Sequence, residues 1–273
     1  MLQDSEFHHA PNCAMAAGPR TAAFGRNLPR IKVLDRFREK FPNGLRRGAR
    51  LVLRGWREPA AVRRVVWDQL SYSGGDTLTE LHDEVRRVDR EEVAGVILEA
   101  GCGSGGSALV MAAAKAPDRE LLVFDVFGMP PGPSAKDGPD VHRRWDEIAS
   151  GRSGGIGSRT YYGYVDGLLD TIVATFRRYG LPPERNRIRF VKGLVQDTLD
   201  GDEPVALAHI DCDRYESVRT CLERIAPRLA AGGVMVVDDY DFKSGCRLAV
   251  DEFLEANPAF AMIRRTRVHI VRQ

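Results

Sequence analysis

Acidic residues follow several short apolar runs of this 273-residue chain, and they are the side chains best placed to do chemistry: Glu99, Asp125, Asp211 and the pair Asp238 and Asp239. In an open parallel sheet, ligands bind beyond the carboxyl ends of the strands. We expect Asp211, Asp238 and Asp239 to converge there, and three carboxylates cannot share a small volume cheaply without a cation. Oxygen ligands without His or Cys favour Mg²⁺, Mn²⁺ or Ca²⁺ over zinc. The pattern predicts a divalent-metal site; the alternative is turn aspartates satisfied by helix N-termini.

A glycine-rich turn, VILEAGCGSGGS over residues 96–107, joins an apolar run to an alanine-rich helical pattern. Strand, glycine turn and helix form the first unit of a nucleotide-binding α/β sheet. Glycine allows positive φ and close approach of a ligand to the main chain. Gly101, Gly103 and Gly106 fit the spacing G-x-G-x-x-G, which also describes a dinucleotide site. Asp125, 19 residues past Gly106, stands where an acid would bond the ribose hydroxyls of a nucleoside; the alternative is a turn or cap aspartate.

The elements that must position these residues alternate between strands and helices from about residue 96 onward. Apolar runs predict strands at 96–98, 121–124, 188–191, 205–210 and 234–237, with two short strands near 261–265 and 268–271. Helical spacing lies between most of them. The interval 127–163, rich in Gly, Pro and Ser, is expected to be a long loop, and loops of this length are often lids or binding loops.

The N-terminal third shows helical spacing before the sheet begins. We expect residues 1–27 to be irregular and helices to follow over about 31–41, 62–70 and 77–88. Thr77 could cap the third helix, with Glu80 as its capping-box partner. The predicted organisation is therefore a helical cover over residues 1–92 and a ligand-binding domain over 93–273, with 127–163 as its lid loop.

Composition and charge exclude several classes of protein. The chain is 43% hydrophobic and 29% charged, as in a soluble globular protein. No apolar stretch approaches the roughly 20 residues of a membrane helix, and no secretory signal pattern opens the chain. Five cysteines without a C-x-x-C pair favour reduced thiols and a cytoplasmic location over a disulfide framework or zinc site. We expect no membrane partner.

Positive charge is concentrated at the N-terminal end. Residues 1–70 carry 14 Arg and Lys against 6 Asp and Glu, although the whole chain has a net charge of only +2. This excess of positive charge indicates either basic helices that face solvent or a surface that binds an anionic substrate or partner. Few aromatic residues are interleaved with the basic ones, so we expect no nucleic-acid partner.

Four stretches resemble one family, the macrocin-type sugar O-methyltransferases. EAGCGSGGS from Glu99, with Asp125 behind it, resembles the S-adenosylmethionine (SAM) loop and ribose-binding acid of class I methyltransferases. FDVFGMPP at 124–131 resembles D-S-F-x-G-L-P-P, and FVKGLVQDTL at 190–199 resembles F-x-K-G-x-x-x-D-T-L. HIDCDRYES at 209–217 resembles L-D-G-D-x-Y-E-S. The likeness runs from about residue 78 to 255.

The resemblance implies a class I methyltransferase fold, an α/β, Rossmann-like and mostly parallel seven-stranded sheet flanked by helices, with the N-terminal helical extension. It also implies SAM as methyl donor and a metal such as Mg²⁺ on Asp211, Asp238 and Asp239, as in catechol O-methyltransferase. The Gly-x-x-Gln segment of that enzyme resembles residues 193–196. The implied cofactor-binding residues are Glu99, Gly101, Gly103, Ser107, Asp125, Gly193, Val195, Gln196 and Asp211. Two departures are the glycine loop, where the family usually has G-V-W/Y-x-G-G, and Cys212, which replaces a glycine.

The expected reaction is in-line methyl transfer from SAM to a hydroxyl of a small molecule, a sugar or other polyol, most simply a sugar on a natural product. An aliphatic hydroxyl has a pKa near ~15.7 and aspartate ~3.9, so complete proton transfer would cost about 16 kcal/mol. A divalent ion on the hydroxyl closes much of that gap. Asp211 is the first choice for metal ligand and proton acceptor. A histidine could be the base instead: His209 beside the site, His142 or His269.

Other functions stay open at this point. An NAD-linked oxidoreductase would explain the glycine spacing and Asp125 but leaves the three aspartates without a task. A catechol-type, phenolic O-methyltransferase would use the same metal set. A protein that keeps SAM without turnover is a third possibility. The acceptor is not defined by the sequence, and we expect a homo-oligomer.

Overall fold

The computed structural model describes residues 58–273. The irregular segment and the helix predicted before residue 42 lie outside them. The α-helices are α3 (Ala60–Trp67), α4 (Gly75–Arg90), α5 (Gly106–Ala114), α6 (Pro139–Ala149), α7 (Leu168–Arg178), α8 (Val195–Thr198), α9 (Tyr215–Ile225) and α10 (Ser244–Ala256). The strands are β1 (Val96–Ala100), β2 (Leu121–Asp125), β3 (Ile188–Lys192), β4 (Val205–Ile210), β5 (Leu229–Val237), β6 (Phe260–Arg264) and β7 (Val268–Arg272).

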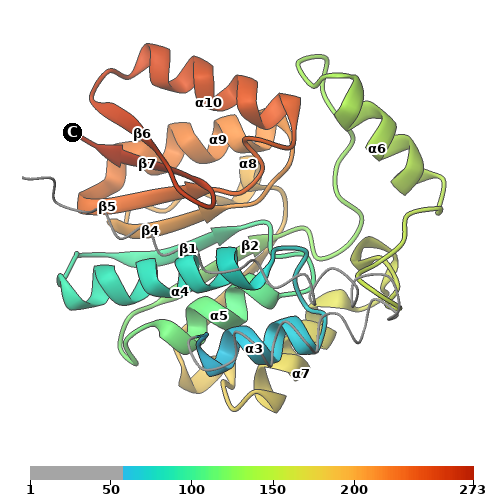
Figure 1. Cartoon of the computed structure of the whole chain (residues 1–273), viewed down its shortest axis with the longest axis horizontal. Helices are drawn as coiled ribbons and strands as arrows, with labels where there is room; N and C mark the ends of the chain where they lie inside the picture. Colours follow the sequence, from blue (N-terminus) through green and yellow to red (C-terminus); the bar gives the residue numbers. More distant parts are fainter. Residues whose placement is uncertain (1–57) are drawn as a thin grey trace, which may run out of the picture. The chain divides into compact units, whose positions relative to one another are not determined.

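The strands form one seven-stranded sheet in the order β3-β2-β1-β4-β5-β7-β6 (Figure 1). Strands β1 to β5 run parallel, whereas β7 is antiparallel to both β5 and β6. Every residue of β1, β2 and β4 is buried, because helices cover both faces of the sheet. The sequences of these strands are therefore largely apolar. The order and directions confirm the predicted class I methyltransferase fold.

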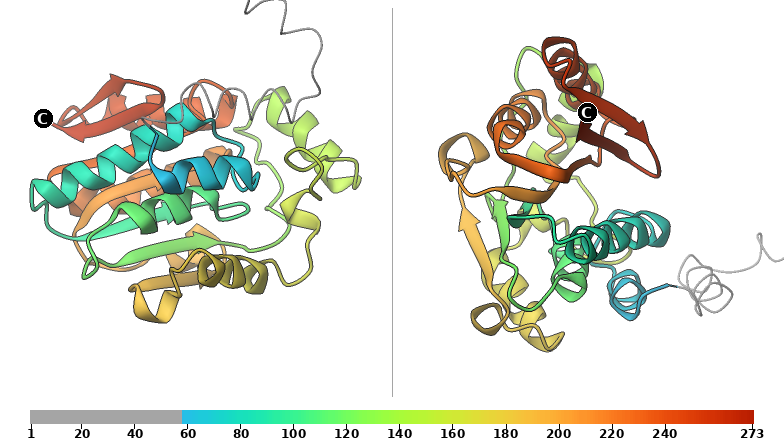
Figure 2. Two further views of the ribbon diagram at one scale, coloured as in Figure 1. Left: turned by 60° about the horizontal axis from the view of Figure 1, so that its bottom comes forward. Right: turned by 90° about the vertical axis from the view of Figure 1, so that its left-hand side faces the viewer.

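Helices cover both faces of the sheet (Figure 2). Two apolar cores lie on its opposite faces, since side chains alternate along each strand. One core joins the sheet to α3, α4, α5 and α7, and includes Ile97 and Phe176. The other joins it to α8, α9 and α10, and includes Leu98 and Leu222. Helices α3 and α4 therefore share a core with the sheet, and both pack against α5. None of the helices in residues 58–273 is long and apolar enough to cross a bilayer.

The interval 127–163, expected to lack structure, contains helix α6. Pro139 opens α6 at a position where a missing N–H costs nothing, and Val141 and Ile148 bury its inner face. The segment before α6 is bonded to the C-terminal half, because Asp137 Oδ1 accepts the Tyr215 N–H at 2.9 Å. Because the helix has only two buried apolar residues, its sequence shows no clear helical repeat of apolar positions between the flanking glycines and prolines.

The predicted capping box at the start of α4 is wrong. The helix begins at Gly75, with Gly74 as its N-cap, and no side chain caps it. Glu80 instead accepts the Thr266 N–H at 3.1 Å, from the turn between β6 and β7. A tertiary contact has replaced the local one.

Candidate active site

The glycine loop between β1 and α5 lies against the end of β4. Gly101 has φ +85°, and a Cβ there would lie 2.1 Å from the Asp211 carbonyl oxygen. Gly106 is equally restricted, because a Cβ would lie 2.3 Å from the Leu70 carbonyl oxygen. Only glycine fits these two positions, so the loop brings its main chain close to the acidic segment after β4.

Asp125, the last residue of β2, holds this loop through its main chain. Its Oδ2 accepts the N–H groups of Cys102 at 2.7 Å and Gly103 at 3.2 Å, and its Oδ1 accepts that of Phe127 at 2.7 Å. Burial raises the pKa of this carboxyl, while the three N–H donors act to lower it. Both oxygens of Asp125 are thus satisfied by the chain itself.

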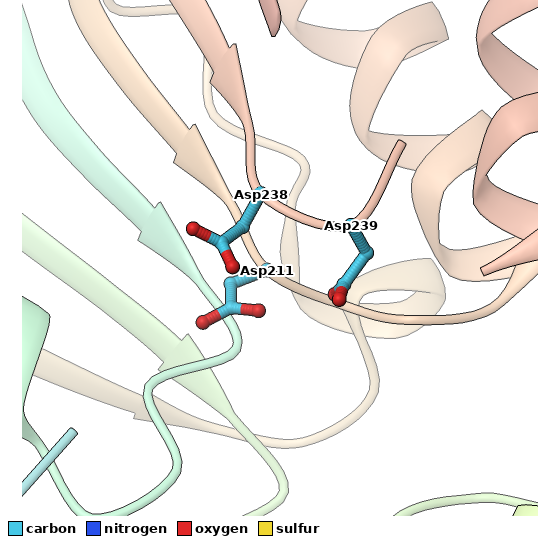
Figure 3. Close-up of side chains that lie close together, drawn as sticks. All are labelled: Asp211, Asp238 and Asp239. Carbon is cyan, nitrogen blue, oxygen red and sulfur yellow. The ribbon is translucent and has the colours of Figure 1, made fainter. Parts of the chain in front are cut away.

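Asp211, Asp238 and Asp239 come together at the ends of β4 and β5 (Figure 3). Ile210 pairs with Val237 in the parallel register, so the next residues leave the same edge of the sheet. One oxygen from each carboxylate lies within 4.8 Å of the other two. Burial and the neighbouring Asp238 raise the pKa of Asp211 to about 8. Burial and the surrounding carboxylates also raise the pKa of Asp239 well above its usual value.

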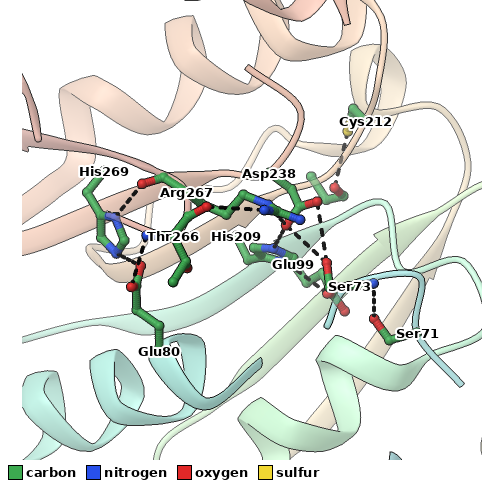
Figure 4. Close-up of polar contacts among 11 residues, drawn as sticks. Ser71, Ser73, Glu80, Glu99, His209, Cys212, Asp238, Thr266, Arg267 and His269 are labelled. Atoms are coloured by element: carbon green, nitrogen blue, oxygen red, sulfur yellow. Dashed lines mark hydrogen bonds and ion pairs between the residues drawn. The ribbon is translucent and has the colours of Figure 1, made fainter. Parts of the chain in front are cut away.

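A buried polar network supports Asp238 from behind (Figure 4). Glu99 Oε1 lies 3.0 Å from His209 Nδ1, and His209 Nε2 lies 3.7 Å from Asp238 Oδ1. Burial favours the neutral imidazole, but the contacts with Asp238 and Glu99 raise the pKa of His209 to about 10. Asp238 also accepts hydrogen bonds from Arg267 Nε at 2.8 Å and Ser73 Oγ at 3.3 Å.

These contacts set the ionisation of Asp238 and the role that His209 can play. Burial acts against ionisation of Asp238, yet His209 and Arg267 lower its pKa to about 2. A protonated imidazole has no lone pair to accept a proton. Because both ring nitrogens of His209 face carboxylates, its position fits a residue that orients Asp238, and its role as a base stays a prediction. His142 contacts the Ser134 carbonyl oxygen at 3.2 Å, and His269 that of Arg267 at 3.3 Å.

Two cavities, of about 420 and 60 Å³, meet at the glycine loop and share walls that include Gly101, Asp125 and Asp211. Gly103, Ser107, Asp238 and Asp239 line the larger cavity only. Gly193 and Val195 line the smaller one only. Of the predicted cofactor residues, Glu99 and Gln196 line neither; Glu99 holds His209, and Gln196 Nε2 lies 3.5 Å from Ser217 Oγ.

Sequence reasoning missed Asp213 and Arg267 as site residues. Asp213 lines both cavities with φ +62°, an uncommon conformation for a residue other than glycine. Its signal was available, as the second acid in the motif HIDCDRYES. Arg267 lies in the turn between β6 and β7 and reaches Asp238 because β7 folds back antiparallel onto β5. No motif marked it.

Residues 60–268 match the family described as Macrocin-O-methyltransferase (TylF). The 8-demethyl-8-(2,3-dimethoxy-alpha-L-rhamnosyl)-tetracenomycin-C 4'-O-methyltransferase of Streptomyces olivaceus is 31% identical over 208 residues, 72% of this chain and 74% of that protein. The mycinamicin III 3''-O-methyltransferase of Micromonospora griseorubida is 29% identical over 191 residues, 66% and 68% of the two chains.

Two solved structures share the fold. The O-methyltransferase NovP superimposes with a TM-score of 0.60 at 26% identity, covering 75% of this chain and 82% of that one. The calicheamicin methyltransferase CalS11 shares the fold, with a TM-score of 0.55 at 21% identity over 85% and 93% of the two chains. The chain is an O-methyltransferase and belongs to the macrocin O-methyltransferase family.

Proposed function

We propose that this chain transfers the methyl group of SAM to a sugar hydroxyl of a glycosylated natural product, with a divalent cation held by Asp211, Asp238 and Asp239. The observation that carries the proposal is the convergence of these three carboxylates on the wall of the larger cavity, beside the glycine loop. The names of two relatives support the acceptor class, since they describe methylation at the 4' position of a rhamnosyl compound and the 3'' position of mycinamicin III.

The cavity lining supports SAM as the donor. Seven of the nine residues predicted to bind the cofactor line one or both cavities: Gly101, Gly103, Ser107, Asp125, Gly193, Val195 and Asp211. The close main-chain approach at Gly101 and the acid at the end of β2 are the features that a nucleoside ligand requires. When bound, SAM supplies an electrophilic methyl group on a sulfonium. The residues of this chain hold the donor and exclude water around it.

The acidic cluster fits a divalent cation. Asp239 Oδ2 is buried without a hydrogen-bond partner in the described part of the chain. Burial and the neighbouring carboxylates raise the pKa values of Asp211 and Asp239, and oxygen ligands of this kind suit Mg²⁺. When bound, such an ion lowers the pKa of a coordinated hydroxyl. Glu99 and His209 keep Asp238 oriented and ionised for this task.

Two carboxylates can accept the proton of the acceptor hydroxyl. Asp211, the predicted base, would serve as metal ligand and base together. Asp213 is outside the ligand set, lines both cavities, and lies 3.7 Å from Lys243 Nζ through its Oδ1. Measuring both kcat and Mg²⁺ affinity separates the role of base from the role of metal ligand. If Asp213 is the base, Asp213→Asn lowers kcat and keeps Mg²⁺ affinity, whereas Asp211→Asn lowers both.

Methyl transfer from labelled SAM to a panel of rhamnosyl glycosides and catechols tests the proposal. We expect a methylated glycoside, with the label on a sugar oxygen. Methylation of catechols alone would favour the catechol-type alternative, which shares the metal set. An NAD-linked oxidoreductase is disfavoured by the family and by the antiparallel β7, since the dehydrogenase sheet has the order 3-2-1-4-5-6. The homo-oligomeric state remains a prediction.

A further inference from the structure

Two aromatic side chains stand exposed where the larger cavity opens. Tyr72, in the connection between α3 and α4, is 57% exposed, and Phe242, in the connection between β5 and α10, is 62% exposed. The wall of the same cavity carries Asp211, Asp238 and Asp239. The cavity therefore combines an acidic wall with exposed aromatic side chains.

We propose that Tyr72 and Phe242 form a collar that binds an apolar aglycone, while the acidic wall receives the sugar attached to it. This inference rests on the proposed function and specifies its substrate class. The acceptor is a neutral glycoside that already carries its aglycone. Covering an exposed aromatic ring with an apolar surface is favourable, because both surfaces leave water. A rigid ring provides this contact area at little cost in conformational entropy.

Both aromatic residues are tied to the acid cluster through the same carboxylate. Ser73, the neighbour of Tyr72, places its Oγ 3.3 Å from Asp238 Oδ1. The guanidinium of Arg267 lies 5.1 Å from the centroid of the Phe242 ring and donates from Nε to Asp238 Oδ1 at 2.8 Å. The collar is thus held at a defined position relative to the reaction site, which is what a bipartite acceptor needs.

The charges in the cavity favour a neutral acceptor over a nucleoside-diphosphate sugar. A diphosphate is bound by cations with free donors, most often arginine. The basic residues that line the larger cavity each already contact a carboxylate: Arg267 with Asp238 at 2.8 Å, Lys243 with Asp213 at 3.7 Å and Arg144 with Glu147 at 2.6 Å.

Trp67 provides a matched control for the collar. It is 68% exposed, at the end of α3, and lines neither cavity. Trp67→Ser removes an exposed aromatic ring of similar size without touching the collar. Phe242→Tyr keeps a ring at the collar and reports on any general disturbance of the segment that precedes α10.

The test is calorimetric binding of two probes to the full chain loaded with S-adenosylhomocysteine and Mg²⁺. The probes, 4-methylumbelliferyl α-L-rhamnoside and methyl α-L-rhamnoside, share one sugar and differ in the aglycone. We expect the aryl glycoside to bind about tenfold more tightly, one ring contact being worth about that factor. Tyr72→Ser and Phe242→Ser should each remove most of the difference, whereas Trp67→Ser and Phe242→Tyr should retain it.

Several results would overturn the collar. These are equal affinity of the two probes, no binding of either probe to the loaded chain, unchanged preference in both serine variants, or tighter binding of TDP-rhamnose than of the aryl glycoside. Failure of the proposed function looks different. In that case the chain would not bind S-adenosylhomocysteine, or would transfer no methyl group to any glycoside.

Discussion

Strands β2, β4 and β5 each end in carboxylates at the same edge of the sheet. The surroundings of the carboxylate at the end of β2 differ from those of the carboxylates at the ends of β4 and β5. Asp125 accepts three backbone N–H groups, so the chain itself completes its environment. Asp211 and Asp239 face other carboxylates, and Asp239 keeps a buried oxygen without a partner in the described residues. The backbone already bonds both oxygens of Asp125, whereas Asp211 and Asp239 are available to a cation or a proton.

One carboxylate thus holds the glycine loop in place, and the others face one another. A buried carboxylate that is fully hydrogen-bonded organises the main chain around it. Burial and neighbouring carboxylates raise the pKa values of Asp211 and Asp239, and perturbed values are typical of sites that bind a cation or move a proton. The two kinds of acid should therefore respond differently to substitution.

Replacing Asp239 should have the largest effect on activity. Asp239→Asn removes one of the three charges proposed to hold the cation, and we expect kcat/KM to fall by about 10³-fold, corresponding to about 4 kcal/mol of lost stabilisation. Steady-state methyl transfer at saturating SAM measures it. Asp241→Asn, an exposed aspartate two residues further on, is the control and should stay near wild-type activity. Comparable activity of the two variants would remove Asp239 from the site.

Asp125→Asn should act on structure and donor binding rather than on the metal. The amide loses the charge that three N–H groups share, and hydrogen bonds to charged groups contribute about 1.5–3 kcal/mol. We expect the free energy of unfolding to fall by about 2 kcal/mol and the Kd of SAM to rise at least about tenfold, with Mg²⁺ affinity retained. Urea unfolding and calorimetry measure these changes. Asp118→Asn, on the surface, is the control, and equal stability of the two variants would contradict the role of Asp125.

Mg²⁺ should stabilise the wild-type protein but not the Asp239→Asn variant. At a concentration of 100 Kd, a ligand that binds only the folded state adds about 2.7 kcal/mol, a rise in Tm of roughly 5–10 °C for a chain of this size. Without metal, the variant should melt at or above the wild-type temperature, because one of the repelling charges is gone. Equal stabilisation of both proteins by Mg²⁺ would place the ion elsewhere.

The metal-free protein should lose stability as the pH rises, a smaller effect than the others. Asp211 has a folded pKa of about 8, above its unfolded value near 3.8, so its contribution is complete below pH 3.8 and is lost as the pH rises through 8. His209, with a folded pKa of about 10, adds a loss with the same sign between about 6.5 and 10. Unfolding free energies across this range measure the slope, and Asp211→Asn should flatten its lower part. Stability that rises from pH 5 to 8 would contradict the assignment.

The positions of the acids at the strand ends could be predicted from the sequence, because parallel strands that are buried on both faces have continuous apolar sequences. The acids at the ends of β4 and β5 had to meet, since adjacent parallel strands end at one edge of the sheet. The sequence could not say how each acid is satisfied. That depends on which N–H groups and side chains the loops deliver.

The parts that sequence reasoning missed depend on contacts between distant segments. Ser73 and Arg267 both reach Asp238, from the α3–α4 connection and from the turn between β6 and β7, and neither carries a local pattern. The capping box failed for the same reason, because Glu80 is used by Thr266. Helix α6 was missed because it buries only Val141 and Ile148. The polar contacts at its start come from distant segments, since Asp137, just before it, accepts the Tyr215 N–H and Asp140 accepts the Ser244 N–H.

The most direct test of the central claim is methyl transfer by the chelator-treated protein during titration with Mg²⁺. If Asp211, Asp238 and Asp239 hold a cation that the reaction needs, EDTA will reduce transfer from SAM to a rhamnosyl glycoside to background, and Mg²⁺ will restore it along a single saturation curve. The Asp239→Asn variant will show no such recovery at the same concentrations. Full activity in the presence of EDTA would contradict the account.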